Sequence, residues 1–252
     1  DAGRVYMDTG VLSNAGSVNA ASIPAIVASE SNATIPIIQL DGGMEPLIDR
    51  GLLNPVSVVR AQNLELYRSL YPETDSEKTL RLEMLQYVRD SVTRAEAITG
   101  ENDRLTTVDD AEQKIRNQIE SNVGEKLVVN DEDLVPYQTN APASVNARLA
   151  EAFALTGKLI SNDIVSCVNL GIGGFDTHAS QETRIDPLLT SLDFILYTFV
   201  EQLRAANKLD STLIVCYSDF GRTPKVNNSN GRDHWPVGGA LMIGGGIDGG
   251  RA

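Results

Sequence analysis

Two short apolar runs joined through one long helical segment constrain the fold of this chain more than any other feature. Residues 164–170 and 212–217 are apolar and rich in β-branched residues. Runs without polar alternation are typical of parallel strands that are covered on both faces. Residues 187–207 between them predict a long helix, and a strand–helix–strand connection of this length gives a right-handed crossover. The pattern therefore predicts an α/β fold with a right-handed, mostly parallel sheet.

The rest of the chain indicates three parts. Residues 1–54 are interpreted as the N-terminal part of the α/β core. Residues 55–140 are dense in charged and amide side chains, with apolar residues at helical spacing and no alternating strands, which favours a helical insertion or cap. A solvated helical hairpin without direct chemistry is the plainer alternative for it. Residues 141–252 are interpreted as the C-terminal part of the core, which holds the candidate metal site.

Each part contains elements that the residue pattern predicts. Helices are expected over residues 22–28, 77–99, 107–127, 144–161 and 187–207. Strands are expected over residues 34–40, 164–170, 212–217 and 240–243. On the helix over residues 77–99, one side is expected to carry the apolar residues Leu80, Leu82, Leu85, Val88 and Val92.

The charge balance excludes several classes of partner. The chain of 252 residues has 34 acidic against 21 basic residues and a net charge of −13. Such a surface repels nucleic acid and anionic membranes, so neither is an expected partner. No apolar stretch reaches the length of about 18 residues needed to span a bilayer. Any anion site must therefore be built locally, from a metal ion or from arginine.

Neither the cysteines nor the ends of the chain identify a compartment. Cys167 and Cys216 each lie in an apolar run, and we expect both to act as small buried hydrophobic residues without a disulfide framework. The chain begins at Asp1 and stops at Ala252 just after a glycine turn. We expect further segments at both ends.

The two histidines of the chain define the candidate site. His178 follows the strand over residues 164–170 and lies two positions after Asp176, while His234 lies directly after Asp233. Asp219 ends the second strand. In open parallel sheets sites form beyond the carboxyl ends of the strands, so these side chains are expected to gather there. Either Asp–His pair alone is a common chance arrangement; together they predict a divalent metal ion of the zinc, manganese, calcium or magnesium kind.

Arginines in the same loops add a possible anion contact. Arg222 and Arg232 carry forked donors that suit the oxygens of a phosphate or sulfate. A salt bridge to Asp219 or Asp233 is an equal alternative for them. The run at residues 244–246 is interpreted as a tight glycine turn, because it lacks the spacing of a phosphate-binding loop.

Four motifs in order resemble the bacterial family named "domain of unknown function 1501", which is related to the alkaline-phosphatase/sulfatase superfamily. The resemblance is close over residues 142–250 and looser over residues 15–60. The motifs are Gly-Phe-Asp-Thr-His-Ala-Ser-Gln from residue 174, Ser-Asp-Phe-Gly-Arg-Thr-Pro-Lys-Val-Asn from 218, Gly-Arg-Asp-His-Trp-Pro from 231, and Gly-Gly-Gly-Ile-Asp-Gly-Gly from 244.

The resemblance implies a doubly wound α/β core of the alkaline-phosphatase type, with a mostly parallel sheet and a two-metal site. By motif, Asp176 and His178 look like the first metal loop, and His234 looks like the late histidine. Asp219 lies where the superfamily has its Asp-His-Gly turn, but Phe220 stands where a second-metal histidine is found.

Two supporting roles and a nucleophile complete the expected site. Arg222 would hold the anion, and Asp233 would orient His234 from behind. The best local candidate for a nucleophile is Asp8-Thr9-Gly10, for which a plain turn is the alternative.

The resemblance implies a metal-dependent hydrolase of phosphate or sulfate esters, with an anionic ester as its substrate. A non-catalytic, exported binding or assembly protein that keeps the fold and binds a protein partner is the alternative. The phenylalanine at position 220, the absence of an unambiguous nucleophile and the acidic surface favour that alternative. A metal-dependent isomerase or mutase would share the same ligands. Because relatives commonly carry an export signal, the expected location is periplasmic or extracellular.

Overall fold

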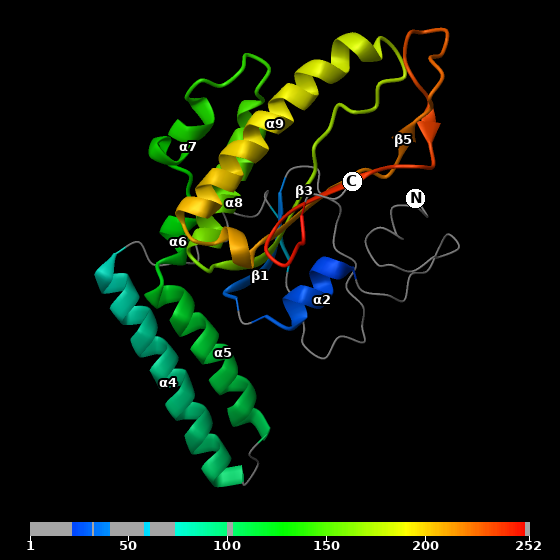
Figure 1. The fold of residues 1–252 in the computed structure, drawn as a ribbon. Coiled ribbons are helices and arrows are strands. Elements are labelled where there is room, and N and C mark those ends of the chain that lie inside the picture. The colour runs from blue at the N-terminus through cyan, green and yellow to red at the C-terminus, as the bar shows by residue number, and fades with distance from the viewer. Residues whose placement is uncertain (1–21, 32, 41–57, 61–73, 100–102, 250–252) are drawn as a thin grey trace. The chain divides into compact units, whose positions relative to one another are not determined.

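The computed structural model describes residues 22–31, 33–40, 58–60, 74–99 and 103–249 (Figure 1). The chain divides into two compact units, residues 1–61 with 129–252 and residues 62–128. The helices are α2 (Ile23–Ser29), α4 (Asp75–Thr99), α5 (Asp103–Glu120), α6 (Val123–Lys126), α7 (Asp131–Gln138), α8 (Ala147–Ser161) and α9 (Gln181–Ala205), with a short 3-10 helix at Leu209–Ser211. The strands are β1 (Ile35–Leu40), β2 (Val58–Arg60), β3 (Val165–Leu170), β4 (Leu213–Tyr217), β5 (Gly221–Arg222), β6 (His234–Trp235) and β7 (Ala240–Gly244). None of the described helices is long and apolar enough to cross a bilayer.

A three-stranded parallel sheet in the order β2-β1-β3 lies in the first unit. Ile35 pairs with Val165 and Ile37 with Cys167. β1 is the central strand, and its isoleucines are fully buried. α2 packs Ala25 and Ala28 against Ile37. The predicted strand over residues 164–170 therefore does form a parallel pair, with β1 as its partner.

The strand predicted over residues 212–217 differs from the expectation. β4 pairs antiparallel with β7 in a separate two-stranded sheet, so the prediction of a parallel strand buried on both faces is wrong. Ile214 and Cys216 pack against the helical core, whereas Leu213 and Val215 are 55% and 46% exposed in the described structure. The cause is local. The chain turns back through β5 and β6 after β4, and an apolar run does not reveal the direction of its partner.

The main core of the first unit lies between α7, α8 and α9. The rings of Phe153 and Phe199 meet edge to face with centroids 5.2 Å apart. Tyr137 is buried, and its hydroxyl donates a 2.7 Å hydrogen bond to Gln202. Leu170, at the end of β3, packs on the same core. This packing fixes the end of β3, from which the candidate site begins.

The second unit is a hairpin of α4 and α5. On α4, Leu82, Leu85 and Val92 are half-buried, but Leu80 and Val88 are 55% and 52% exposed. The three half-buried residues recur at spacings of three and seven, which keeps them on one stripe of a helix. Val88 lies on the same side, three residues after Leu85 and four before Val92, but is exposed. Leu80 falls outside the stripe, so the expectation that all five share one side is corrected for Leu80.

The helices also depart from the predicted pattern in three places. The helix expected over residues 107–127 is divided into α5 and α6 at Asn122, whose φ of 52° is left-handed. α9 begins at Gln181, before the expected start, and contains Pro187 inside it. α7 was not expected at all. Its first turn is stabilised by the carboxylate of Asp133, which accepts a 2.9 Å hydrogen bond from the Asn130 backbone N–H.

The cysteines are half-buried free thiols. Cys167 packs against the α2–β1 cluster, and Cys216 against the core of α8 and α9. Burial raises the pKa of Cys167 to about 11 and also raises the pKa of Cys216. Both thiols are therefore protonated at neutral pH and are poor nucleophiles.

We expect Asp133→Asn to destabilise the first unit by about 1 kcal/mol at neutral pH. Burial by itself raises the pKa of Asp133, but the Asn130 N–H and the ammonium of Lys158 at 2.7 Å together lower it below 3.8. A lowered folded-state pKa adds stability above the unfolded-state pKa, and this stability is lost as pH falls through the folded value. The difference between the two proteins should therefore shrink progressively as the pH falls below about 4.

Urea unfolding at several pH values measures this effect. Asp131→Asn is the matched control, because Asp131 is an exposed residue in the same helical turn. A difference for Asp133→Asn that is the same at pH 3 and pH 7 would contradict the role of the carboxylate charge.

Candidate metal centre

One half of the candidate site is the loop between β3 and α9, residues 171–180. In Figure 1 this yellow-green segment leaves β3 and leads to the N-terminal end of α9, which lies near β5. Gly174 has a φ of 96°, a conformation that L-residues with side chains rarely adopt. The Thr177 N–H donates to the Phe175 carbonyl at 3.0 Å. This tight loop carries Asp176 and His178.

The other half is the hairpin of β5 and β6. Arg222 pairs with His234 across this hairpin. Backbone hydrogen bonds join the two halves: Ser180 N–H donates to the Ser229 carbonyl at 3.0 Å, and Arg232 N–H to the Thr177 carbonyl at 3.3 Å. These bonds bring together two histidines that lie 56 positions apart in the chain, at residues 178 and 234.

Asp176, His178 and His234 form one cluster. The Oδ1 atom of Asp176 lies 3.1 Å from Nε2 of His178 and 2.9 Å from Nε2 of His234. One ligand atom from each residue lies within 4.8 Å of the others. Two ligand atoms of a tetrahedral zinc ion lie about 3.3 Å apart, given bonds of about 2.0–2.1 Å. The cluster therefore has the donor types and spacing that could hold a metal ion.

His178 faces a carboxylate at each ring nitrogen. Its Nδ1 atom lies 3.1 Å from Oδ1 of Asp233, while Nε2 faces Asp176. A neutral imidazole has only one N–H donor, so one of these contacts would set a lone pair against a carboxylate oxygen. Either a second proton or a metal cation at Nε2 removes that repulsion. Asp233 was expected to orient His234, but its contact is with His178, and this corrects the expected role.

Asn227 is a site residue that ends the second motif but was given no role from the sequence. Its Nδ2 donates to Oδ1 of Asp233 at 3.1 Å and to the backbone carbonyl of His178 at 2.9 Å. Its Oδ1 accepts from the N–H of Ser229 at 2.9 Å and of Gly231 at 3.0 Å. All four bonding positions of the amide are thereby used. Asn227 connects the hairpin loop to the His178 loop and holds Asp233 in place.

Arg222 binds the loop of Asp176. Its Nη2 donates to Oδ1 of Asp176 at 2.8 Å and to the Phe175 carbonyl at 2.6 Å, and its Nη1 to the Arg232 carbonyl at 2.7 Å. Its guanidinium also lies 4.7 Å from the ring centre of Phe220. The sequence suggested an ion pair of Arg222 with Asp219 or Asp233, but the structure pairs it with Asp176 instead. Both terminal nitrogens position that ligand, so a direct hold on an anion is not favoured by this geometry.

The second predicted metal position is not assembled in the described structure. Phe220 stacks on His234 with ring centres 3.8 Å apart and planes at 7°. Asp219 is exposed at the end of β4 and is not among the three clustered ligands that the described residues provide. The candidate nucleophile Asp8-Thr9-Gly10 lies outside the described residues.

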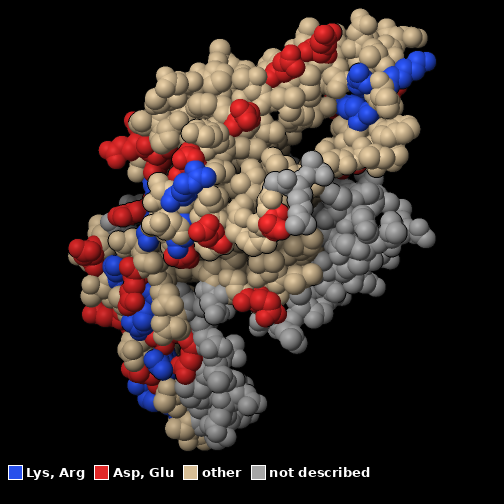
Figure 2. Space-filling view, in the orientation of Figure 1, with Lys and Arg blue, Asp and Glu red and all other residues tan. Residues whose placement is uncertain are grey.

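The local electrostatics keep the carboxylates ionised. Hydrogen bonds from His234 and Arg222 lower the pKa of Asp176 to about 2. Hydrogen bonds from Asn227 and His178 lower the pKa of Asp233. Figure 2 shows a group of basic side chains over the β5–β6 end of the face in view. The Asp176 carboxylate is therefore ionised at neutral pH, the form that binds a metal ion.

Comparison with known proteins identifies the family. A family model described as "Protein of unknown function (DUF1501)" matches residues 53–252. No curated protein and no solved structure matches the chain. The matched range includes the whole cluster of Asp176, His178 and His234, together with Asn227 and Arg222. The chain therefore belongs to the DUF1501 family.

Proposed function

We propose that this chain binds a divalent metal ion through Asp176, His178 and His234 and hydrolyses phosphate or sulfate esters. The observation that carries the proposal is the meeting of both histidine Nε2 atoms on one Asp176 oxygen, at 3.1 and 2.9 Å. Two histidines and one carboxylate also form the ligand set of several hydrolytic metal sites, which leave a further position open for water or substrate. The exposure of these side chains, 61%, 49% and 47%, makes that position accessible.

The chain's own residues would orient this centre. Arg222 holds the Asp176 carboxylate from one side. In the tautomer with its proton on Nδ1, His178 would donate a hydrogen bond from Nδ1 to Asp233, which leaves Nε2 free to ligate. A bound ion supplies Lewis-acid polarisation of an ester oxygen and a lowered pKa for water. Zinc, manganese, calcium or magnesium is the class of ion that we propose; the two imidazoles favour zinc or manganese.

We propose that the fold is a doubly wound α/β core of the alkaline-phosphatase/sulfatase type. Three features support it: the β2-β1-β3 sheet is parallel, α2 and α8 both contact β3, and the candidate site begins directly after the carboxyl end of β3. Sites at that edge are the rule in open α/β sheets. The periplasmic or extracellular location is proposed from the family resemblance alone.

Elemental mass spectrometry of the purified protein tests the proposal first. Wild type is expected to hold about one equivalent of metal after exposure to zinc or manganese, and His178→Ala/His234→Ala is expected to hold none. Asp193→Asn, an exposed change on α9, is the control for surface charge. Asp219→Asn should retain the metal, since Asp219 lies outside the cluster. Wild-type protein that takes up no metal would overturn the proposal.

Hydrolysis assays on metal-loaded protein test the reaction. Release of phosphate or sulfate from simple esters by wild type, and its loss in the double histidine variant, would support a hydrolase. Metal binding without release of either anion would favour the non-catalytic binding protein. Rearranged esters without free anion would favour an isomerase or mutase.

A further inference from the structure

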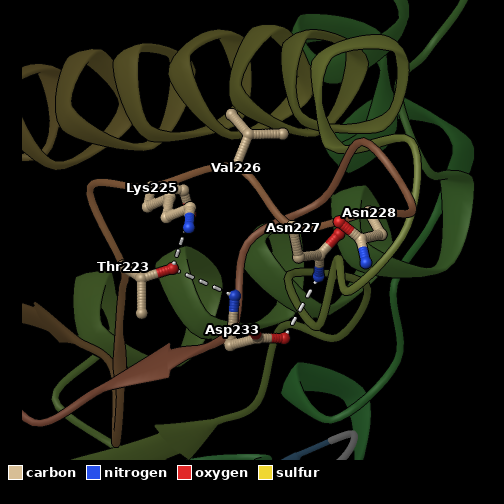
Figure 3. A pocket seen from close by; sticks show the side chains of 6 residues that line it. All are labelled: Thr223, Lys225, Val226, Asn227, Asn228 and Asp233. Carbon is tan, nitrogen blue, oxygen red and sulfur yellow. Dashed lines mark hydrogen bonds between the residues drawn. The ribbon is translucent and has the colours of Figure 1, made fainter.

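A pocket lies in the loop between β5 and β6, next to the candidate metal centre. Its volume is ≈ 290 Å³, and Figure 3 shows its side chains around one opening. Asp233 belongs to both places, because it lines the pocket and also contacts Nδ1 of His178. The lining residues are Thr223, Lys225, Val226, Asn227, Asn228 and Asp233.

Some of these residues already make hydrogen bonds within the loop. Thr223 donates its hydroxyl to the Lys225 carbonyl at 3.0 Å and accepts from the Asp233 N–H at 3.2 Å. The Asn227 amide has its four partners. Together these bonds make a rigid frame, visible as the dashed lines between the side chains in Figure 3. These bonds leave the other side-chain polar groups of the pocket lining without partners among the described residues.

Three polar groups remain available to a ligand. Lys225 makes no ion pair with any described residue, and Asn228 makes no side-chain hydrogen bond within the described ranges. Both hydrogen bonds that reach the Asp233 carboxylate end on Oδ1, which leaves Oδ2. The pocket thus offers an ammonium donor, an amide that donates and accepts, and a carboxylate acceptor.

This mixture fits hydroxyl groups better than an anion. A phosphate or sulfate accepts hydrogen bonds only, and it would face the Asp233 carboxylate. A hydroxyl both donates and accepts, so neighbouring hydroxyls can bond the ammonium and the carboxylate at once. Val226, 48% exposed, adds an apolar contact for a carbon skeleton. We infer that this pocket binds the alcohol part of the substrate and that this part is a sugar or a comparable polyol.

The inference rests on the proposed function and names the substrate class for the same site. The ring of His178 lies between Asp233 of the pocket and Asp176 of the candidate centre. An ester group at the metal and a hydroxyl in the pocket would therefore belong to one small molecule, whose polyol part is bound beside the ester that is cleaved.

Matched substrates test the assignment. The substrates are glucose 6-phosphate and methyl phosphate, and glucose 6-sulfate and methyl sulfate, each assayed with metal-loaded protein. Lys225→Met should lower kcat/KM for the glucose esters by about tenfold, and Asn228→Ala by about fivefold, while the methyl esters change by less than about twofold. Ser229→Ala is the control, since its side chain does not line the pocket. Equal losses on glucose and methyl esters would mean that Lys225 binds the anion, and would overturn the inference.

Binding of unesterified glucose separates this inference from the proposed function. Saturation-transfer NMR should detect glucose on wild type and on the Ser229→Ala control but not on Lys225→Met/Asn228→Ala. Absence of glucose binding by wild type overturns the pocket assignment, whatever the hydrolysis assays show. If glucose binds through these residues but no ester is cleaved, the hydrolase proposal fails and the pocket assignment stands.

Discussion

Replacement of Gly231 by alanine is expected to weaken metal binding by up to roughly 150-fold, although glycine offers no ligand. A Cβ atom at this position would lie 2.2 Å from the backbone carbon and oxygen of His178. Backbone atoms cannot move aside as a flexible side chain can, so the two loops must separate. Overpacking of this kind costs about 1–3 kcal/mol. If that cost falls on closing the loops over the centre, metal affinity drops by roughly 5- to 150-fold.

Two measurements identify the cause of this loss. Zinc affinity by competition with a chromogenic chelator should fall for Gly231→Ala, while circular dichroism should show an unchanged helical core, because the core of α7, α8 and α9 does not include this loop. Gly173→Ala is the matched control: it lies in the loop of Asp176, but a Cβ there meets nothing within 4 Å. Equal affinity in the two variants would show that the close contact at Gly231 does not support the centre.

Prediction from the sequence succeeded for elements that a local residue pattern determines. It failed for features that depend on contacts with distant residues. The helices α8 and α9 and the strands β1, β3, β4 and β7 were expected from periodicity and apolar runs. The structure confirms them within about three residues, except that α9 begins six residues earlier than expected. The antiparallel pairing of β4 was missed because strand direction is set by the path of the chain between strands. α7 was not predicted because its stability comes from the contacts of Asp133 and Tyr137. Those contacts do not produce a helical repeat of apolar residues in the sequence.

The candidate site shows the same division. The two histidines could be predicted to meet because each follows a strand and lies beside an aspartate. Which aspartate serves which histidine could not be predicted, because neighbours in the chain point apart on an extended hairpin. Asp233 contacts His178, 55 positions away, although it directly precedes His234. The role of Asn227 could not be assigned for a related reason: three of its four hydrogen bonds are to backbone groups, and the fourth is to Asp233, and the residue type reveals none of these partners.

The substitution Asp176→Asn is expected to lower metal affinity by more than about 100-fold. Asp176 is the shared partner of both histidines, and its change removes the one anionic member of the three-residue cluster. The asparagine keeps its size and one carbonyl oxygen, so Arg222 retains an acceptor and the loop should keep its shape. Loss of a residue that only orients a ligand typically costs about 10–100-fold. Asp233→Asn is therefore expected to fall in that smaller range.

The order of the two losses distinguishes a ligand from a residue that positions one. Zinc affinities of wild type, Asp176→Asn and Asp233→Asn, measured in one chelator competition series, give that order directly. A larger loss at Asp176 means that its carboxylate binds the ion. The ion pair with Arg222 then serves to position that carboxylate for metal binding. Wild-type affinity in Asp176→Asn would mean instead that this carboxylate is a structural partner of Arg222. The centre would then consist of two histidines, too few protein ligands for a stable catalytic ion, and the hydrolase proposal would lose its foundation.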